Sequence, residues 1–470
     1  MIADLKPYAE YKESGLPWLG PVPGHWRAVR NGSLFGQRNQ TGYAELPILE
    51  VSLKTGVRVR DFGKSSTRKQ VMSDLGKYKR AAKGDLAYNT MRMWQGALGV
   101  CPVDGLVSPA YVVARPHPGV EPQFFAALFR TGDYMAEIDN ASRGIVKDRN
   151  RLYWDQFKQM LSPCPPLAEQ VAIVRFLDWA NGRLERTIRA KRKVIALLNE
   201  QKQAIIHRAV TRGLDPAVPL KPSGIPWLGD IPKHWEVRRL RQVVVMKPSK
   251  SESVDVLRKD GEVTFLPMER VGTSGIIDSS ETVSATSVWN GFTYFRRGDV
   301  IVAKITPCFE NGKGAFLDAL PTEVGFGSTE FHVVRPGPRL LGAYLRLITS
   351  SSQFLESGTN TMTGSAGQQR VPTDFVKNYM IVLPSVEEQR SILESVNGDA
   401  SRINAVVSRL NREIELLREY RTRLVADVVT GKLDVREAAA RLPEVEEAPT
   451  DEPELAGEDE TIDDLAEETA

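Results

Sequence analysis

The stretch SGLPWLGPVPGHW, residues 14–26, occurs a second time in the chain as SGIPWLGDIPKHW, residues 223–235. Between 14–30 and 223–239, 10 of 17 aligned positions are identical, and these include both tryptophans and the histidine. A phrase this long does not recur by chance, and an internal repeat changes the architecture to be expected. The sequence therefore predicts a duplicated frame.

Three further phrases recur in the same order. They are SPAYVVARP (108–116) with STEFHVVRP (328–336), PPLAEQ (165–170) with PSVEEQ (384–389), and VTRGLD (210–215) with VTGKLD (429–434). The offset between the copies is 209 at the tryptophan phrase and 219 to 220 at the other three. The two halves thus share their ends and differ in their interiors, so we expect one frame that carries two divergent inserts.

Each half changes its character at a proline. The parts at about 27–160 and 236–380 are rich in Val, Ile, Phe, Tyr and glycine-containing turns, which is typical of strands. The parts at 168–211 and 386–430 contain no proline and are rich in Leu, Ile, Arg, Glu and Gln, which indicates long helices. Apolar residues in both recur at alternating spacings of three and four, as in a coiled-coil seam. The alternative is that each helix packs only on its own domain.

The predicted fold class is α+β, with two globular mixed α/β domains, each followed by a long helix. We place the first domain with its N-terminal joint at 1–165, the first long helix at 166–215, the second domain with its repeated joint at 216–384, the second long helix at 385–435, and an acidic disordered tail at 436–470. Residues 441–470 hold 13 acidic residues and one basic residue. Their net charge is −12, which leaves +15 on residues 1–440.

Composition limits the class of protein. The chain has 470 residues, of which 41% are hydrophobic and 26% charged, and no apolar run approaches the roughly 20 residues of a membrane span. The first residues lack a secretory signal, and three separated cysteines form no disulfide framework. We expect a cytoplasmic protein without membrane contact. The basic body favours a polyanionic partner.

Catalytic motifs are incomplete. Gly63-Lys64-Ser65 resembles the end of a phosphate-binding loop, but Arg58 stands where that loop needs a glycine. Asp4, Glu10 and Lys12 resemble a nuclease set, yet we expect them in a loose N-terminal arm. No glycine-rich loop for S-adenosylmethionine and no Asn-Pro-Pro-aromatic tetrapeptide occurs, and the five histidines lack metal spacing. We expect a non-catalytic chain that binds no cofactor or metal.

Basic and amide side chains gather in the two inserts, and these residue types can pair with phosphates and with the edges of guanine or adenine. The DNA-binding residues that we predict in the first insert are Lys54, Arg58, Arg60, Lys64, Arg68, Lys69, Lys79, Arg80, Arg92, Arg143, Lys147, Arg149, Asn150 and Arg151. Those in the second insert are Arg258, Lys259, Arg270, Lys304, Lys313, Gln368, Gln369 and Arg370. For any single residue, a solvated charged face is an equally good reading.

Four features recur in one order in both halves: the tryptophan phrase, Gly-Asp before a strand, PPLAEQ before a helix and VTRGLD at the end of that helix. Over about residues 10–435, this order resembles the DNA-specificity (S) subunit of type I restriction-modification systems. The resemblance implies two target-recognition domains, each reading half of a split site in double-stranded DNA. It implies that the two helices pair as an antiparallel coiled coil within a pseudo-twofold repeat. TGSAGQQRVPTDF (363–375) resembles the family's stretch near the bases, while its equivalent RGIVKDRNRLYWDQF (143–157) lacks the Gly-Gln pattern.

The resemblance also implies partners. Two methyltransferase subunits would dock mainly on the helices and two restriction subunits would join for cleavage, so that S-adenosylmethionine, ATP and Mg²⁺ act on those subunits. We interpret the repeated phrase as a structural joint that packs against the other half's helix ends, with Trp18, His25, Trp26, Trp227, His234 and Trp235. Two other functions stay open, a coiled-coil scaffold and a DNA-modifying enzyme with an unrecognised active site.

Overall fold

The computed structural model describes residues 5–53, 55–60, 75–143, 150–365 and 367–443. The chain divides into two compact units, one made of Met1–Arg189 with Ile414–Ala470 and the other of Ala190–Glu413. Each unit therefore holds one globular domain and a part of each long helix. None of the helices in the described ranges combines the length and apolar character that a membrane crossing requires.

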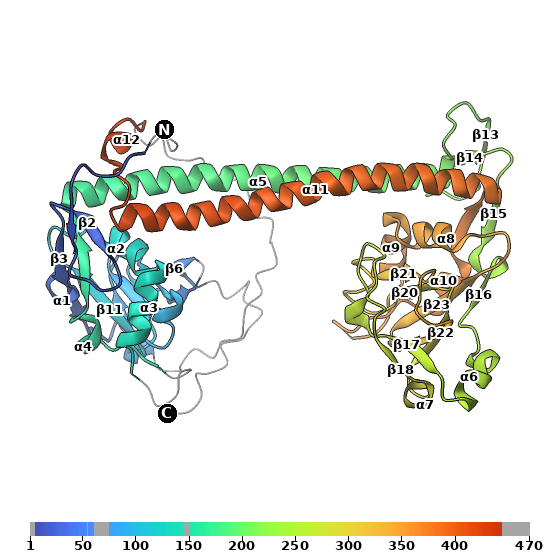
Figure 1. The fold of residues 1–470 in the computed structure, drawn as a ribbon, viewed down its shortest axis with the longest axis horizontal. Coiled ribbons are helices and arrows are strands. Elements are labelled where there is room, and N and C mark those ends of the chain that lie inside the picture. The colour runs from blue at the N-terminus through green and yellow to red at the C-terminus, as the bar shows by residue number, and fades with distance from the viewer. Residues whose placement is uncertain (1–4, 54, 61–74, 144–149, 366, 444–470) are drawn as a thin grey trace. The chain divides into compact units, whose positions relative to one another are not determined.

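The first unit contains short strands, short helices and parts of the two long helices (Figure 1). Its strands are β1 (Tyr11–Glu13), β2 (Pro21–Pro23), β3 (Arg27–Arg30), β4 (Phe35–Arg38), β5 (Leu49–Ser52), β6 (Gly56–Val59), β7 (Lys79–Ala81), β8 (Leu86–Asn89), β9 (Leu98–Val100), β10 (Gly105–Val107), β11 (Tyr111–Pro116) and β12 (Leu161–Cys164). Its helices are α1 (Asn31–Leu34), α2 (Pro122–Phe129), α3 (Gly132–Ala141), α4 (Trp154–Phe157), α12 (Arg436–Ala440), the first part of α5 (Leu167–Arg212) and the last part of α11 (Val386–Val429).

The second unit has the same kinds of element and the remaining parts of α5 and α11. Its strands are β13 (Leu220–Pro222), β14 (Asp230–Pro232), β15 (Glu236–Arg239), β16 (Val244–Met246), β17 (Glu262–Leu266), β18 (Thr282–Ser284), β19 (Thr293–Arg296), β20 (Val300–Ala303), β21 (Gly314–Phe316), β22 (Val324–Gly327), β23 (Phe331–Pro336) and β24 (Met380–Leu383). Its shorter helices are α6 (Val254–Arg258), α7 (Ala285–Val288), α8 (Gly342–Thr349), α9 (Ser352–Thr359) and α10 (Thr373–Asn378).

The two units share one order of strands. The antiparallel sheet β4-β11-β8-β9 of the first unit recurs in the second as β16-β23-β20-β21. The pair β12-β3 recurs as β15-β24, and β1-β2 recurs as β13-β14. The remaining strands differ, because the first unit has the pairs β5-β6 and β10-β7 whereas the second has the sheet β18-β17-β22-β19. The strand order thus contains the duplicated frame and the two divergent inserts expected from the sequence.

The repeated Gly-Asp pair makes the tight turn before β8 and β20. The glycines at 84 and 298 have φ values of 89° and 90°, which favour glycine over any other residue. Each following aspartate is buried and accepts the backbone N–H of the residue three positions earlier at 2.9 Å. The same carboxylates pair with Arg38 and Arg335 of the sheets, each through Nε at 2.6 Å. The Gly-Asp pair therefore has a structural role at this turn in both units.

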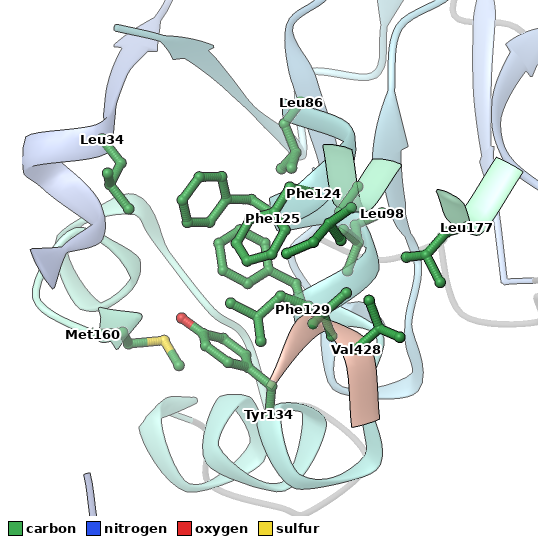
Figure 2. Close-up of a cluster of buried hydrophobic side chains, with 14 of the residues drawn as sticks. Leu34, Leu86, Leu98, Phe124, Phe125, Phe129, Tyr134, Met160, Leu177 and Val428 are labelled. Carbon is green, nitrogen blue, oxygen red and sulfur yellow. The ribbon is translucent and has the colours of Figure 1, made fainter. Parts of the chain in front are cut away.

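Both long helices contribute to each hydrophobic core. Figure 2 shows the core of the first unit. Its labelled members come from the sheet, α2, α5 and α11, among other elements, and are Leu34, Leu86, Leu98, Phe124, Phe125, Phe129, Tyr134, Met160, Leu177 and Val428. In the second unit, Ile206 and Val210 of α5 and Ile392 and Val396 of α11 are buried in one cluster with residues of the sheet. Each such side chain contributes roughly 1.5–3 kcal/mol, so neither domain core is complete without both helices.

The helices also contact each other inside each unit. In the second unit, Lys191 Nζ lies 2.5 Å from Glu413 Oε2 and Lys202 Nζ donates to Asn404 Oδ1 at 3.2 Å. From the first of these contacts to the second, the residue numbers rise along α5 and fall along α11, so these two helix segments run in opposite directions. In the first unit, an ion pair of 3.4 Å joins α5 and α11 between Glu185 and Arg421. The apolar residues of α11 that follow the spacing of three and four lie at 396, 403, 407, 410, 414, 417, 424 and 428, and all are buried or half-buried.

Two expectations about the chain ends were wrong. Residues 436–443 are not part of a tail, because α12 forms there and Val435, Ala439 and Leu442 are buried. The N-terminal arm is not loose from residue 5 onward, since Tyr8 is buried and Tyr11 lies in β1. Apolar and aromatic side chains hold both segments on the first domain. The acidic residues 444–470 lie outside the described part of the chain.

Candidate nucleic-acid interface

Each copy of the tryptophan phrase is anchored to a glutamate at the start of a long helix. In the first unit, Glu169 accepts hydrogen bonds from Trp26 Nε1 at 2.9 Å and from Tyr8 Oη at 2.7 Å, and His25 Nε2 lies 2.6 Å from its other oxygen. The Glu169 side chain is only 5% exposed. A buried carboxylate is stable where several donors satisfy it, so this cluster fixes the joint to α5.

The second unit repeats this arrangement. Glu388 accepts a hydrogen bond from Trp235 Nε1 at 3.0 Å, and His234 Nε2 lies 2.7 Å from the same oxygen. The Ser385 N–H donates to the second oxygen at 3.0 Å. Burial acts to raise the pKa of Glu388, but the hydrogen bonds from Trp235, His234 and Ser385 outweigh it and hold that pKa at about 2. The carboxylate is therefore ionised at any physiological pH.

The glutamine after each glutamate ties the helix to its own globular domain. Gln170 and Gln389 are buried, with exposed fractions of 1% and 0%. Their side-chain oxygens accept the backbone N–H groups of Glu121 and Leu341, each at 2.8 Å. These two residues immediately precede α2 and α8. The Glu-Gln pair in PPLAEQ and PSVEEQ therefore connects the joint, the long helix and a domain helix.

The inner tryptophan of each joint packs against a helix end from the other half of the sequence. In the first unit Gly431, just after α11, lies against Trp26, and in the second unit Gly213, just after α5, lies against Trp235. The outer tryptophans, at 18 and 227, pack on the rings of Tyr134 and Tyr379, with centroids 5.1 and 5.4 Å apart. Each joint is thus built from both halves of the sequence.

Three loops of the second domain are joined side by side. They are residues 267–277, 304–313 and, apart from residue 366, 363–371. The third loop is bound to the second through the Val371 N–H, which donates to the Lys304 carbonyl at 2.8 Å, and through a bridge between Ile305 and Arg370. The first is bound to the second because Lys313 Nζ donates to the Met268 carbonyl at 3.3 Å. We call these three segments the second-domain loop set.

Arg370 is fixed at the edge of this loop set. Its guanidinium makes a two-pronged ion pair with Glu330, with an Nη2–Oε1 distance of 2.8 Å and an Nε–Oε2 distance of 3.0 Å. Its Nη1 donates to the carbonyl of Gln368 at 3.1 Å. The Arg370 side chain remains 44% exposed. The backbone N–H groups of Gln368 and Gln369 donate to the Ser365 carbonyl at 2.9 Å and to Thr306 Oγ1 at 3.0 Å, whereas their side-chain amides have no hydrogen-bond partner among the described residues.

A buried arginine of α8 connects two loops of the second-domain loop set through hydrogen bonds to their carbonyls. Arg346 of α8 is 9% exposed, and its Nη2 donates to the carbonyls of Thr273 at 3.2 Å and Gly312 at 2.9 Å. Burial lowers the pKa of Arg346 to about 10, so the group stays charged at neutral pH. The loop that it holds carries Ile276, whose exposure of 74% is the highest among the exposed large hydrophobic residues that the structure describes.

The first domain has a corresponding loop set. The Leu152 N–H donates to the Thr90 carbonyl at 2.9 Å, as Val371 does to Lys304, and a bridge between Arg143 and Arg151 closes the loop, as a bridge between 363 and 370 does in the second domain. Arg130 donates to the carbonyls of residues 53 and 96. The predicted DNA-binding residues Lys54, Lys64, Arg68, Lys69, Lys147 and Arg149 lie outside the described residues.

Several predicted residues of the first domain have partners inside the protein. Lys79 Nζ donates to the carbonyl of residue 111 at 2.7 Å, and burial lowers the pKa of Lys79. Arg58 pairs with the carboxylate at position 50, Arg80 with that at 104, and Asn150 Nδ2 lies 3.4 Å from the oxygen of residue 139. Arg60 follows β6, and Arg92 precedes a 3-10 turn. Lys79 and Arg80 are thus largely occupied in holding the domain.

In the second domain the predicted residues fall into two groups. Lys304, Lys313, Gln368, Gln369 and Arg370 belong to the loop set, as does Arg270, which pairs with the carboxylates at 278 and 281. Arg258 and Lys259 lie at the end of α6, where Arg258 pairs with the carboxylate at position 255. The sequence reading missed Glu330, Arg130 and Arg346. None of the three lies in a basic cluster of the sequence, and their contacts depend on loops that are distant along the chain.

The site holds no group of side chains suited to a metal. Among the described residues, no cluster of three or more His, Cys, Asp or Glu side chains could bind a metal ion. What the loop sets offer is positive charge, amide groups and one exposed apolar side chain. These are the groups with which proteins contact phosphates and base edges.

The chain is similar to known proteins of one kind. Residues 232–415 match the family model described as type I restriction modification DNA specificity domain. The EcoAI specificity subunit of Escherichia coli is 39% identical over 168 residues, which are 35% of this chain and 28% of that protein. The EcoEI specificity subunit of Escherichia coli is 38% identical over 167 residues, which are 35% of this chain and 27% of that protein. The matched stretch thus spans little more than a quarter of these relatives.

A solved structure covers most of the fold. A chain from the structure titled "Structural basis underlying complex assembly and conformational transition of the type I R-M system" aligns with a TM-score of 0.62 at 17% identity, over 88% of this chain and 99% of that chain. At this identity the likeness supports the fold alone. The family model and the two relatives are thus of one kind, type I restriction specificity proteins, and each matches only a part of this chain.

Proposed function

We propose that this chain is the DNA-recognition subunit of a type I restriction-modification complex and reads a bipartite target, one half-site with each globular domain. One observation carries the proposal: a single frame occurs twice, and each copy presents a loop set with a different insert. Two readers on one frame suit a target made of two unlike half-sites, because only the inserts need to differ.

The two long helices would act as the spacer between the readers. Support comes from the opposed directions of α5 and α11 in the second unit and from their ion pairs in both units. The apolar seam at coiled-coil spacing supports a single antiparallel coiled coil. Such a rod would fix the number of unread base pairs between the half-sites.

Catalysis would lie on partner subunits. Exposed apolar side chains on the helices, such as Leu197, Val406 and Leu416, support docking of two methyltransferase subunits there. Two restriction subunits would complete the complex. S-adenosylmethionine, ATP and Mg²⁺ would act on those partners, and the cytoplasm would be the compartment of the complex.

The test is selection from random duplex DNA by the full chain with its methyltransferase partner. We expect one bipartite motif with an unread gap of constant length. A single continuous motif, or none, would contradict the proposal. Methyl transfer or cleavage by the chain alone would favour an enzyme instead, and binding without steep salt dependence would favour a scaffold.

A second experiment tests the spacer. Seven residues that continue the seam are inserted after residue 189 and again after residue 413, inside α5 and α11. A heptad adds roughly 10 Å, so the gap should grow by about three base pairs. Insertion into only one helix serves as the control, because it breaks the seam. An unchanged gap in the double insertion would exclude the ruler role.

A further inference from the structure

The corresponding loops of the two domains hold their arginines differently. The backbone bonds from residue 371 to residue 304 and from residue 152 to residue 90 place Arg370 and Arg151 at matching positions. The aligned strands SPAYVVARP and STEFHVVRP place Ala110 where the second domain has Glu330. Arg151 therefore has no carboxylate at this point, and no side-chain partner among the described residues. Among the described residues, a glutamate–arginine pair at this point is present in the second domain and not in the first.

The hydrogen bonds of Arg370 define which of its donors remain. A guanidinium has five N–H groups. Its Nε–H faces the two oxygens of Glu330 at 3.2 and 3.0 Å, one Nη2–H faces Oε1 at 2.8 Å, and one Nη1–H faces the Gln368 carbonyl at 3.1 Å. One N–H is left on each terminal nitrogen. Two adjacent donors on a fixed plane match the N7 and O6 acceptors of guanine in the major groove.

The charge of Glu330 argues against a phosphate as the partner. The Arg370 guanidinium holds the pKa of Glu330 below its usual range, so the carboxylate is ionised at neutral pH. A neutralised arginine gains little from a phosphate, and the neighbouring carboxylate repels it. A base edge carries no net charge, so these remaining donors can still bind there. The pair thus favours base reading over backbone contact.

We propose that Arg370 reads a guanine through its two remaining N–H groups and that Glu330 is a positioning residue that fixes the guanidinium plane for that contact. The inference rests on the proposed function and makes it more specific, because it assigns a base to the half-site read by the second domain. Arg151, without such a carboxylate, is not predicted to have this fixed geometry.

The experiment uses the full chain with its methyltransferase partner and the duplex obtained by selection. Each guanine is replaced in turn by 7-deazaguanine, which keeps base pairing and lacks the N7 acceptor. For the unmodified protein we expect binding to weaken roughly 5- to 150-fold at one guanine of one half-site. Arg370→Ala, which has no donor left for N7, should bind the two duplexes equally at that position.

Glu330→Ala should keep the charge of Arg370 and lose most of the 7-deazaguanine discrimination, with an unchanged thermal unfolding temperature. If Glu330→Ala unfolds, Glu330→Gln serves instead, because glutamine keeps the side-chain volume and removes the charge. We expect the same loss of 7-deazaguanine discrimination in that variant. Arg297→Ala is the control, because Arg297 is 44% exposed like Arg370, is paired with a glutamate, Glu323, and lies outside the loop set. It should discriminate as the unmodified protein does.

Three results would overturn the inference. The first is a selected bipartite target with no guanine at which the unmodified protein discriminates against 7-deazaguanine more strongly than Arg370→Ala does. The second is a salt slope of log K that falls by about 0.9 in Arg370→Ala, which marks a phosphate contact. The third is that Glu330→Ala discriminates against 7-deazaguanine as strongly as the unmodified protein does. That result would show that Glu330 does not position Arg370. All three leave the proposed function intact, whereas failure to select any bipartite target overturns both.

Discussion

Gly431 tests the packing of a helix end against the first joint. It has a φ of 79°, and a Cβ added there would lie 2.4 Å from Cδ and 2.8 Å from Cγ of Pro23. An L-residue in this conformation costs about 1–2 kcal/mol. The Pro23 ring is held by the pairing of β2 with β1, so relieving the clash costs about 1–3 kcal/mol more. We expect Gly431→Ala to lower the free energy of unfolding by about 2–5 kcal/mol.

The corresponding helix end in the second unit supplies the matched control. Gly213 has a φ of 73°, but its added Cβ would meet only the ring of Trp235, at 3.1 and 3.4 Å. The ring needs to move by a few tenths of an ångström, so the backbone strain of about 1–2 kcal/mol dominates. Gly213→Ala should therefore cost less than Gly431→Ala.

Urea unfolding followed by tryptophan fluorescence measures both losses, since each joint contains two tryptophans. In each variant we compare the urea midpoint of the transition in which the mutated unit unfolds. A shift of this midpoint without a change in the dependence of the unfolding free energy on urea concentration measures the loss of stability. Equal losses for the two variants would refute the reasoning, because the clash with Pro23 would then contribute nothing. A neutral Gly431→Ala would refute it as well, since the helix end would not be seated on the joint.

Three further predictions follow from single side chains. The pKa of Glu388 is held at about 2, below its ordinary 4.5, so the stability that its ionised form contributes is complete above about pH 4.5 and is lost as the pH falls toward 2. Glu388→Gln should therefore reduce the pH dependence of the urea unfolding midpoint between pH 4.5 and 2. The same pH dependence in the variant and the unmodified protein would contradict this. The Asn181 side-chain oxygen on α5 is buried without a hydrogen-bond partner. Asn181→Leu should therefore raise the free energy of unfolding, measured by urea unfolding, by about 1 kcal/mol. A lower free energy of unfolding in the variant would show that the amide oxygen is hydrogen-bonded. Arg151→Ala should reduce the salt slope of DNA binding by about 0.9 if Arg151 contacts a phosphate, measured by binding at several salt concentrations, whereas an unchanged slope would exclude that contact.

The sequence was sufficient for the frame of this protein. Helices expected at 168–211 and 386–430 occupy Leu167–Arg212 and Val386–Val429. Proline marks their starts and long apolar periodicity marks their bodies, and both are local signals. The repeated phrases also mark equivalent elements, because β11 and β23 lie inside the two copies of one phrase. Local patterns therefore predicted the order of elements in both units.

The partners of individual charges could not be predicted. Lys79 and Arg151 are both basic residues of the first insert, yet the Lys79 side chain donates to a carbonyl inside the domain, while the contact described for Arg151 is a backbone bridge with Arg143. Which of them is occupied depends on strands that are distant in sequence. Glu330 and Arg370 are 40 positions apart and meet only because two loops are bonded together. Composition gives the number of charges on a surface, whereas tertiary structure decides which are available.

The bonds that hold the frame explain how two different inserts can be accommodated. Glu169 and Gln170 in the first unit, and Glu388 and Gln389 in the second, bind the joint and the start of a domain helix. None of these bonds ends in the loop sets or in the inserted strands. A change in an insert therefore leaves the anchoring of its domain to the long helices intact. A reader can then acquire a pair such as Glu330 and Arg370 without any compensating change in the frame that carries it.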